Sequence, residues 1–445
     1  MASDLLSIAV TGAKAARTAL DVTAQNIANA STDGYIRRSV SLEEVSSAGG
    51  IGQTGDISLS GVRIDRIVRN ADLFRQAEVR RTGADAARAN AEVSGLENIE
   101  AAVEQSNVFS AISTFEGSLL QLVSDPVDPS LRTAVIEDAR TMTRALNIAA
   151  TSLDAVGEIV RFEAADSVSQ VNILAGELAR VNLRLARASE ASSDQTTLLD
   201  QRDLLLQKLS ELVDINTTIS ADQTVEVRVG GASGPQLVAG GTSYSFAMAT
   251  EADGTISFTL DGNPVTTTSG SLTGKNQALA KLAQVQTDLD TIATDLISTI
   301  NTAQANGVAL DGSAGQAMLS GTGAADIGLA FENGSLIATA PSGAGANSRD
   351  PGNLNAMRTA LTSTDTSGAM DALLFDISST VAGRTVTRDA LQSIANTASI
   401  ALQSQAGVDL DQEAVNLIRF QQAFQASGRV MQVAKDIFDT LLGIR

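Results

Sequence analysis

The sequence has no cysteine, no histidine and no tryptophan, and only 2 tyrosines and 11 phenylalanines among 445 residues. Without cysteine the chain cannot form disulfides or bind zinc through thiolates. Without histidine it lacks the side chain best suited to acid–base catalysis near neutral pH, which excludes Ser-His-Asp, Cys-His, HExxH and histidine-ligated metal sites. Carboxylate and Ser-Lys chemistry stay open on composition alone. We expect no catalytic residues, no metal site and no cofactor, and therefore no enzyme.

The chain is acidic, with 51 acidic and 31 basic residues and a formal net charge of −20. Such a balance disfavours a nucleic-acid-binding surface. No apolar run approaches the roughly 18 residues of a membrane-spanning helix. Lys14 and Arg17 interrupt the region where a cleavable signal peptide would need its apolar segment. We expect no membrane insertion, and either a cytoplasmic protein or one exported without a cleaved signal peptide.

Both ends of the chain carry a row of residues spaced alternately three and four apart. The first row is Leu6, Ala9, Ala13, Ala16, Leu20, Thr23, Ile27 and Ala30. The second row is Leu410, Glu413, Leu417, Phe420, Phe424, Ser427, Met431, Ala434, Phe438 and Leu441. This spacing is typical of helices that pair in a coiled coil. The sequence therefore predicts two paired terminal helices, with the rest of the chain built between them.

Between the ends, helical and strand-like patterns alternate. Gly34 is expected to end the first helix in a left-handed conformation, and Gly61 to mark a bulge in a hairpin near 36–68. Further helices are predicted at 71–123, 130–190, 197–213, 275–305 and 353–405. Residues 230–274 and 306–352 hold 19 of the 36 glycines, which favours small β-rich modules. Strands are predicted there and just before at Val225–Val229, Thr255–Leu260 and Leu336–Ala340.

These patterns predict an α+β multidomain protein with a terminal coiled-coil pair, a long helical-bundle rod and small β-rich insertions distal to the termini. The expected domains are a terminal core of 1–35 with 406–445, a helical rod of 36–215 with 275–305 and 353–405, and β-rich insertions at 216–274 and 306–352.

Two groups of polar residues have both a structural and a functional interpretation. The acidic cluster Asp409–Glu413 lacks the spacing and turn glycine of a calcium loop, so we interpret it as capping the following helix and complementing its dipole. Asn26 and Asn29 lie at the end of a helix, where asparagine is a poor interior residue. Their amides either cap or fray that end, or bind neighbouring subunits, and the residues alone leave both open.

Several stretches resemble one known family. Ala19–Tyr35 (ALDVTAQNIANASTDGY) is similar to the N-terminal signature of the axial family of flagellar rod, hook and hook-associated proteins. Leu198–Leu205 (LLDQRDLL) and Gly407–Ala426 (GVDLDQEAVNLIRFQQAFQA) resemble its hook-associated members, which join hook to filament. Ile437–Leu442 and Asn301–Leu319 fit the same members. Together these stretches cover about a sixth of the chain, mostly at its ends.

The resemblance implies a structural protein of the bacterial flagellum, exported through the flagellar type III apparatus to an extracellular position at the hook–filament junction. It implies a ring of like subunits that contacts the hook protein and a second junction protein. It also implies a cytoplasmic export chaperone that binds at about 405–445. The alternatives are a hook or rod protein of the same family, or a secreted enzyme or adhesin carried on a flagellar export module.

We expect the terminal segments to supply the assembly interface. Its predicted residues are Leu6, Leu20, Asn26, Ile27, Asn29, Thr32, Gly34, Tyr35, Leu417, Phe420, Phe424, Met431, Phe438 and Leu441.

Overall fold

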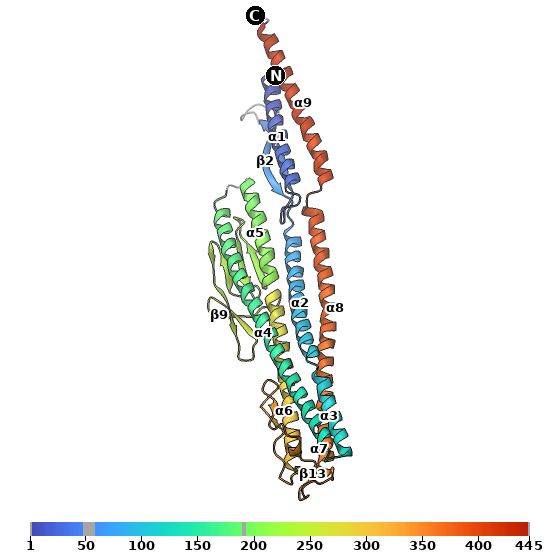
Figure 1. Ribbon diagram of the computed structural model, residues 1–445. Coiled ribbons are helices and arrows are strands. Elements are labelled where there is room, and N and C mark those ends of the chain that lie inside the picture. Colours follow the sequence, from blue (N-terminus) through green and yellow to red (C-terminus); the bar gives the residue numbers. More distant parts are fainter. Residues whose placement is uncertain (1, 48–57, 189–192, 444–445) are drawn as a thin grey trace. The chain divides into compact units, whose positions relative to one another are not determined.

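The structure, a computed structural model, describes residues 2–47, 58–188 and 193–443 (Figure 1). Long helices dominate it, as the periodicity predicts. They are α1 (Ala2–Ala28), α2 (Leu73–Gln105), α3 (Val108–Ser124), α4 (Pro129–Leu185), α5 (Ser193–Leu212), α6 (Ser271–Ala305), α7 (Gly352–Thr364), α8 (Thr366–Ala406) and α9 (Leu410–Gly443).

The strands of the described residues form small antiparallel sheets. They are β1 (Arg38–Ser47), β2 (Ser58–Arg69), β3 (Ile215–Ile219), β4 (Val225–Val229), β5 (Gln236–Ala239), β6 (Thr242–Ser243), β7 (Phe246–Thr250), β8 (Ile256–Leu260), β9 (Asn263–Val265), β10 (Gly307–Val308), β11 (Leu319–Ser320), β12 (Gly328–Leu329) and β13 (Ala340–Pro341). They pair as β1-β2, β3-β4-β5-β6, β7-β8-β9, β10-β13 and β11-β12. The α+β class is thus confirmed.

The chain forms two compact units. Unit 1 contains 1–84, 171–245 and 392–445, and unit 2 contains 85–170 and 246–391. Three of the four limits between them fall inside α2, α4 and α8, so each of these continuous helices contributes to both units, and the fourth falls between β6 and β7. Since the residues on both sides of such a limit have the same helical pattern, periodicity alone does not reveal it.

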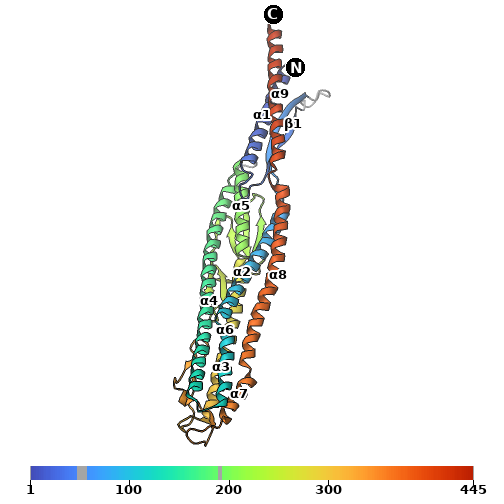
Figure 2. The ribbon, with the colours of Figure 1, turned by 45° about the vertical axis from the view of Figure 1, so that its right-hand side comes forward.

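In unit 1, α1 and α9 lie side by side, and the β1–β2 hairpin packs against α1 (Figures 1 and 2). The sheet β3–β6 is joined to the end of α4 through Asn182, which is buried. Its amide nitrogen donates to Val225 O and Gly240 O at 2.8 Å, and its carbonyl accepts from Val225 N at 3.0 Å. One asparagine therefore bridges the start of β4 and the turn after β5.

In unit 2, parts of the long helices α2, α4 and α8 run alongside α6 (Figures 1 and 2). Lys275 of α6 donates to Ser167 Oγ of α4 at 3.0 Å, and Lys281 of α6 pairs with Asp376 of α8. On α2, Glu92 accepts a 3.1 Å contact from Arg384 of α8. The apolar core beneath these pairs includes fully buried Phe115, Leu119, Leu122, Met142, Leu146, Leu296, Ile300, Leu354 and Met357.

Individual residues and short segments differ in part from the helices and strands predicted from the sequence. Gly34 has the predicted left-handed φ, +74°, but it lies in the turn after α1, which already ends at Ala28. The helices predicted at 71–123 and 353–405 are each interrupted by a left-handed residue, Asn107 in the first and Asp365 in the second. The strand predicted at Leu336–Ala340 is wrong, because 334–336 form a 3-10 turn, and only Ala340 of the predicted strand joins a β-strand.

Arg132 explains that last difference. Its side chain is only 2% exposed and donates to Gly334 O at 3.0 Å, Ile337 O at 2.9 Å and Thr339 Oγ1 at 2.8 Å. A fourth bond runs to Pro126 O at 2.6 Å. Burial lowers the pKa of Arg132 to about 10, because the charged form loses its hydration. The carbonyls of this segment therefore bind a guanidinium rather than a neighbouring strand.

Replacing Arg132 with leucine removes the donor that these buried oxygens share. We expect Arg132→Leu to lower the free energy of unfolding by roughly 3 kcal/mol, measured by urea denaturation. The control is Arg140→Leu, since Arg140 pairs with the exposed Glu137 and should contribute less than about 1 kcal/mol. Equal destabilisation by the two substitutions would contradict the role assigned to Arg132.

Candidate assembly surface

Small residues bring α1 and α9 close together. Ala9, Ala13 and Ala16 of α1 and Ala434 of α9 are buried. A Cβ atom built on Gly12 would lie 3.2 Å from Ser427 Oγ, so glycine leaves room for α9 at this point. The residues spaced alternately three and four apart therefore lie on the face where α1 and α9 meet.

The neighbouring face of α1 packs on the hairpin. Ala15, Ala19 and Val22 are buried there, and Thr11 Oγ1 accepts a 3.4 Å hydrogen bond from Val62 N. Gly61 has φ +100°, and a Cβ on it would lie 2.2 Å from Thr11 Oγ1. The strand pairing shifts register beside it, which agrees with the predicted bulge.

The large residues predicted for the interface are less buried than the small ones. Leu6 is 44% exposed, Phe424 44% and Phe438 54%, while Leu20 and Ile27 are half-buried. Leu417, Phe420 and Met431 are also half-buried, and the Leu441 side chain lies outside what the structure describes. The isolated chain thus buries the alanines of the two rows and leaves part of their large side chains in solvent.

A second apolar row on α9 was not predicted. It contains Val415, Ile418, Val430, Val433 and Ile437, all of them exposed. Successive residues of a helix are turned by about 100°, so these side chains share an arc of about 120° around the axis of α9. The centre of that arc lies nearly opposite Glu413, Leu417 and Ala434. Marking the residues that share a helix face with Val415 would have revealed this row from the sequence.

The asparagines at the end of α1 bond within their own chain. Buried Asn26 donates to Arg38 O at 2.9 Å and accepts from Arg38 N at 3.0 Å and from the Tyr35 hydroxyl at 2.9 Å. Asn29 donates to Gln25 O at 2.9 Å and accepts from Thr32 Oγ1 at 3.3 Å. For Asn26 this is neither a helix cap nor a free amide, because it fixes the start of β1 against α1.

A cluster of arginines and aspartates lies next to this turn. Arg38 Nη2 donates to Asp200 Oδ2 at 2.9 Å, and Arg69 binds both Asp200 and Asp203 at 2.8–2.9 Å. Arg202 donates to Asp203 Oδ1 at 2.7 Å. The Leu198–Leu205 stretch that carried the family resemblance thus supplies the acceptors, although sequence reasoning assigned no role to them.

Burial and ion pairing act in opposite directions on the two carboxylates. Burial alone would raise the pKa of Asp203, but the charges of Arg202 and Arg69 outweigh it and hold this pKa below its usual value. Burial raises the pKa of Asp200, and Arg69 and Arg38 offset that only in part. Two atoms at the cluster, Arg38 Nε and Gln76 Oε1, are buried without a hydrogen-bond partner.

The connection between α8 and α9 is tied to the same region. Arg37 Nε donates to the buried Glu413 at 2.6 Å, and Arg37 N donates to Ala406 O at 2.9 Å. Asn70 Nδ2 adds a 2.6 Å bond to Gln405 O. Asp409 Oδ1 accepts from the backbone N–H groups of Asp411 and Gln412, as expected of a helix cap.

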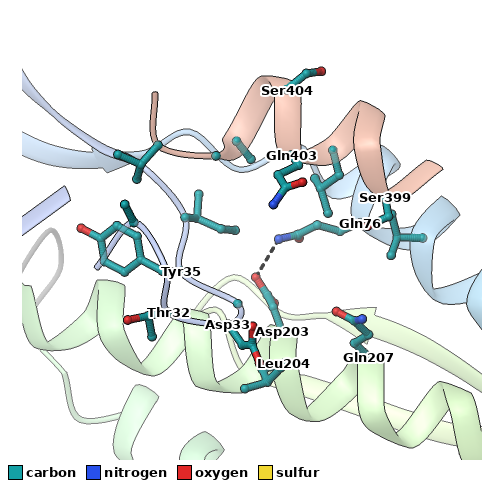
Figure 3. Close-up of a pocket in the computed structure, with 18 of the residues that line it drawn as sticks. Thr32, Asp33, Tyr35, Gln76, Asp203, Leu204, Gln207, Ser399, Gln403 and Ser404 are labelled. Carbon is teal, nitrogen blue, oxygen red and sulfur yellow. Dashed lines mark hydrogen bonds between the residues drawn. The ribbon is translucent and has the colours of Figure 1, made fainter. Parts of the chain in front are cut away.

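A pocket of about 650 Å³ opens at this junction (Figure 3). Predicted interface residues Thr32, Gly34 and Tyr35 line it from the turn after α1. A Cβ on Gly34 would lie 3.3 Å from Leu204 Cβ, so the turn lies against α5. Other lining residues are Gln76, Val79, Arg80, Asp203, Gln207, Ser399, Leu402 and Gln403.

The described residues contain neither a membrane-spanning helix nor a cluster of metal-binding side chains. No helix among 2–47, 58–188 and 193–443 is both long and apolar enough to cross a membrane. Within the same ranges, no three acidic or metal-binding side chains gather as a metal site would require.

The two ends of the chain pair as α1 and α9, and both helices keep large apolar side chains exposed in the isolated chain. The sequence model of the flagellar hook-associated protein FlgK helical domain matches residues 93–319. Models of the flagellar basal body rod proteins match both ends, at 6–35 and 402–444. The chain belongs to the flagellar hook-associated protein FlgK family. The prediction of a flagellar structural protein, of the hook–filament junction type and not an enzyme, is confirmed.

The individual relatives are also flagellar hook-associated proteins. Flagellar hook-associated protein 1 of Bacillus subtilis (strain 168) is 25% identical over 486 aligned positions, covering 96% of this chain and 95% of the relative. The protein of the same name from Salmonella typhimurium is 28% identical over 249 residues, covering 55% of this chain and 44% of the relative. The solved flagellar hook junction protein FlgK of Burkholderia pseudomallei shares the fold, with a TM-score of 0.61 at 15% identity over 73% of this chain and 100% of that one.

The arginine–aspartate cluster generates a stability prediction. We expect Asp203→Asn to lower the free energy of unfolding by roughly 3–5 kcal/mol, because it leaves Arg202 buried without its carboxylate. The measurement is urea denaturation of the purified monomer. Glu43→Gln is the control, since Glu43 and Arg63 are more than half exposed and their pair should contribute less than about 1 kcal/mol. A loss for Asp203→Asn no larger than that of the control would show that the cluster is not stabilising.

Proposed function

We propose that this chain assembles as a ring of like subunits between hook and filament, with its terminal helices at the contacts between copies. The observation that carries the proposal is that α9 is apolar on two opposite faces, of which α1 covers only one. A helix with apolar residues all round is stable only when both faces are covered. Val433, 56% exposed, is typical of the uncovered face.

The finer geometry belongs to the same proposal. We expect α1 and α9 to supercoil as a coiled coil, because their contact follows the three-and-four spacing. Neighbouring copies would then cover the large side chains that the isolated chain leaves exposed. Each such Leu, Val, Ile or Phe contributes about 1.5–3 kcal/mol when fully buried.

We keep the 14 predicted interface residues as proposed contacts between copies, and distinguish the exposed ones from the buried ones. Leu6, Phe424 and Phe438 are exposed and face other chains in the proposal. Asn26 is buried and positions the turn that carries Thr32, Gly34 and Tyr35. The predicted domain division stays part of the proposal, with a terminal core of 1–35 and 406–445 and β-rich insertions at 216–274 and 306–352, whereas the compact units divide the first insertion between 245 and 246.

The proposed partners follow from this arrangement. The hook protein and a second junction protein would lie on the two sides of the ring. Before assembly, a cytoplasmic chaperone bound at 405–445 would cover the exposed row of α9. The chain would pass unfolded through the flagellar export apparatus to an extracellular position.

The alternatives from the sequence are less well supported. A hook or rod protein would share the terminal matches, but the match at 93–319 is to a hook-associated domain. A secreted enzyme or adhesin would need a foreign central module. The same match includes β3–β9, which places these strands inside the family domain.

Placing a charge on α9 tests the proposed contacts. Phe424→Asp and Val433→Asp should each block filament attachment, because an unpaired carboxylate is costly in a packed apolar contact. Electron microscopy should show bare hooks, with filament protein shed into the medium, as expected for a deletion strain. Gln425→Asp is the matched control, since Gln425 is an exposed polar residue beside Phe424.

Normal filaments with both Phe424→Asp and Val433→Asp would show that α9 does not supply the contacts. Immunolabelling at the distal end of the hook separates a failure to assemble from a failure to bind filament protein.

A further inference from the structure

Arg80 lines the junction pocket without a partner of its own. It lies on α2 among the pocket residues, and its guanidinium makes no hydrogen bond or ion pair to any residue that the structure describes. Burial lowers its pKa, and the charge of Arg202 acts in the same direction, whereas Asp203 opposes them. Because Asp203 already accepts from Arg69, Arg202 and Gln76, it has little capacity left for Arg80.

The charges around Arg80 do not balance. Arg38, Arg69 and Arg202 are each nearly buried, and with Arg80 they share the carboxylates of Asp200 and Asp203. Asp33 and Asp409 also line the pocket, but both are exposed, and the Asp409 carboxylate caps α9. Arg80 is half-buried, and the resulting local excess of positive charge, in a chain of net charge −20, indicates a missing anion.

We propose that the junction pocket receives an acidic side chain from a second copy of this chain, whose carboxylate pairs with Arg80. Arginine binds carboxylates through two parallel N–H bonds, and the pocket shields such a pair from water. A volume of about 650 Å³ has room for a short peptide segment around that side chain.

The identity of the occupant follows from where the pocket lies. Thr32, Gly34 and Tyr35, which we assign to contacts between copies, line the same pocket as Arg80. The inference therefore rests on the proposed ring of like subunits. A copy of this chain brings 51 acidic residues against 31 basic ones, so it presents carboxylates in excess.

Replacing Arg80 should have opposite effects on monomer and assembly. In the purified full chain, Arg80→Gln should leave the unfolding midpoint unchanged or raise it, because the lost charge is unpaired. On flagella isolated from cells, it should lower the amount of this protein at the hook end at least about tenfold, a factor equivalent to 1.4 kcal/mol. Arg80→Lys, which keeps the charge, should restore part of that amount.

Arg81→Gln is the matched control, because Arg81 is exposed on the same helix and does not line the pocket. It should change neither measurement. If Arg80→Gln instead destabilises the monomer, with no loss on flagella beyond that instability, Arg80 is structural and the inference is wrong.

Suppressors identify the source of the carboxylate. From a non-motile Arg80→Glu strain we expect motile revertants that replace an exposed Asp or Glu of this same chain by Lys or Arg. Suppressors only in the hook protein would overturn the second copy as the source, and suppressors only at Asp200 or Asp203 would mean that the anion is internal.

The α9 variants distinguish a failure of the pocket inference from a failure of the proposed terminal contacts. If Phe424→Asp and Val433→Asp block attachment while Arg80→Gln assembles normally, only the pocket inference fails. If the α9 variants assemble normally, the proposed terminal contacts fail whatever Arg80 does.

Discussion

The close approach of α1 and α9 is the constraint on which the rest of unit 1 depends. Ala9, Ala13 and Ala16 bury little apolar area each, so their value lies in letting two backbones approach without side-chain obstruction. At Gly12 even a methyl group would lie close to Ser427 Oγ. A seam made of small residues holds two helices together only when other contacts fix their ends. The turn after α1 and the connection before α9 supply those contacts.

Those connections depend on directional polar contacts, in which Asn26 and Glu413 are buried, and this explains why they are specific. Asn26, Arg37 and Asn70 bind backbone groups or a buried carboxylate across long sequence separations, and each bond needs its partner at one position and orientation. The guanidiniums around Asp200 and Asp203 extend the same network into α5. Buried charges stabilise only when fully paired, and Arg38 Nε is buried without a hydrogen-bond partner among the described residues, beside the half-buried Arg80.

The periodic part of this fold could be predicted from the sequence, whereas the polar part could not. Long helices repeat the same spacing over many turns, so α1, α4, α6 and α9 were found close to their limits. The strand expected at Leu336–Ala340 failed because Arg132, some 200 residues away in the chain, binds its carbonyls. No local pattern encodes such a contact. The pairing of Arg69 with Asp203 was missed for the same reason, since isolated charges have no period.

The second apolar row of α9 was missed for a different reason, and that reason bears on function. A single heptad count assumes one partner, and α1 accounts for that partner within the chain. Val415, Ile418, Val433 and Ile437 then have no use in a folded monomer, and their exposure makes the free protein prone to association. A sequence that retains such a row on the face opposite its intramolecular partner is adapted to a state in which more than one chain is present. In the proposed assembly, other chains cover the exposed parts of Phe424 and Phe438 on the row that meets α1, and the folding of α9 against α1 also leaves the opposite face available to them.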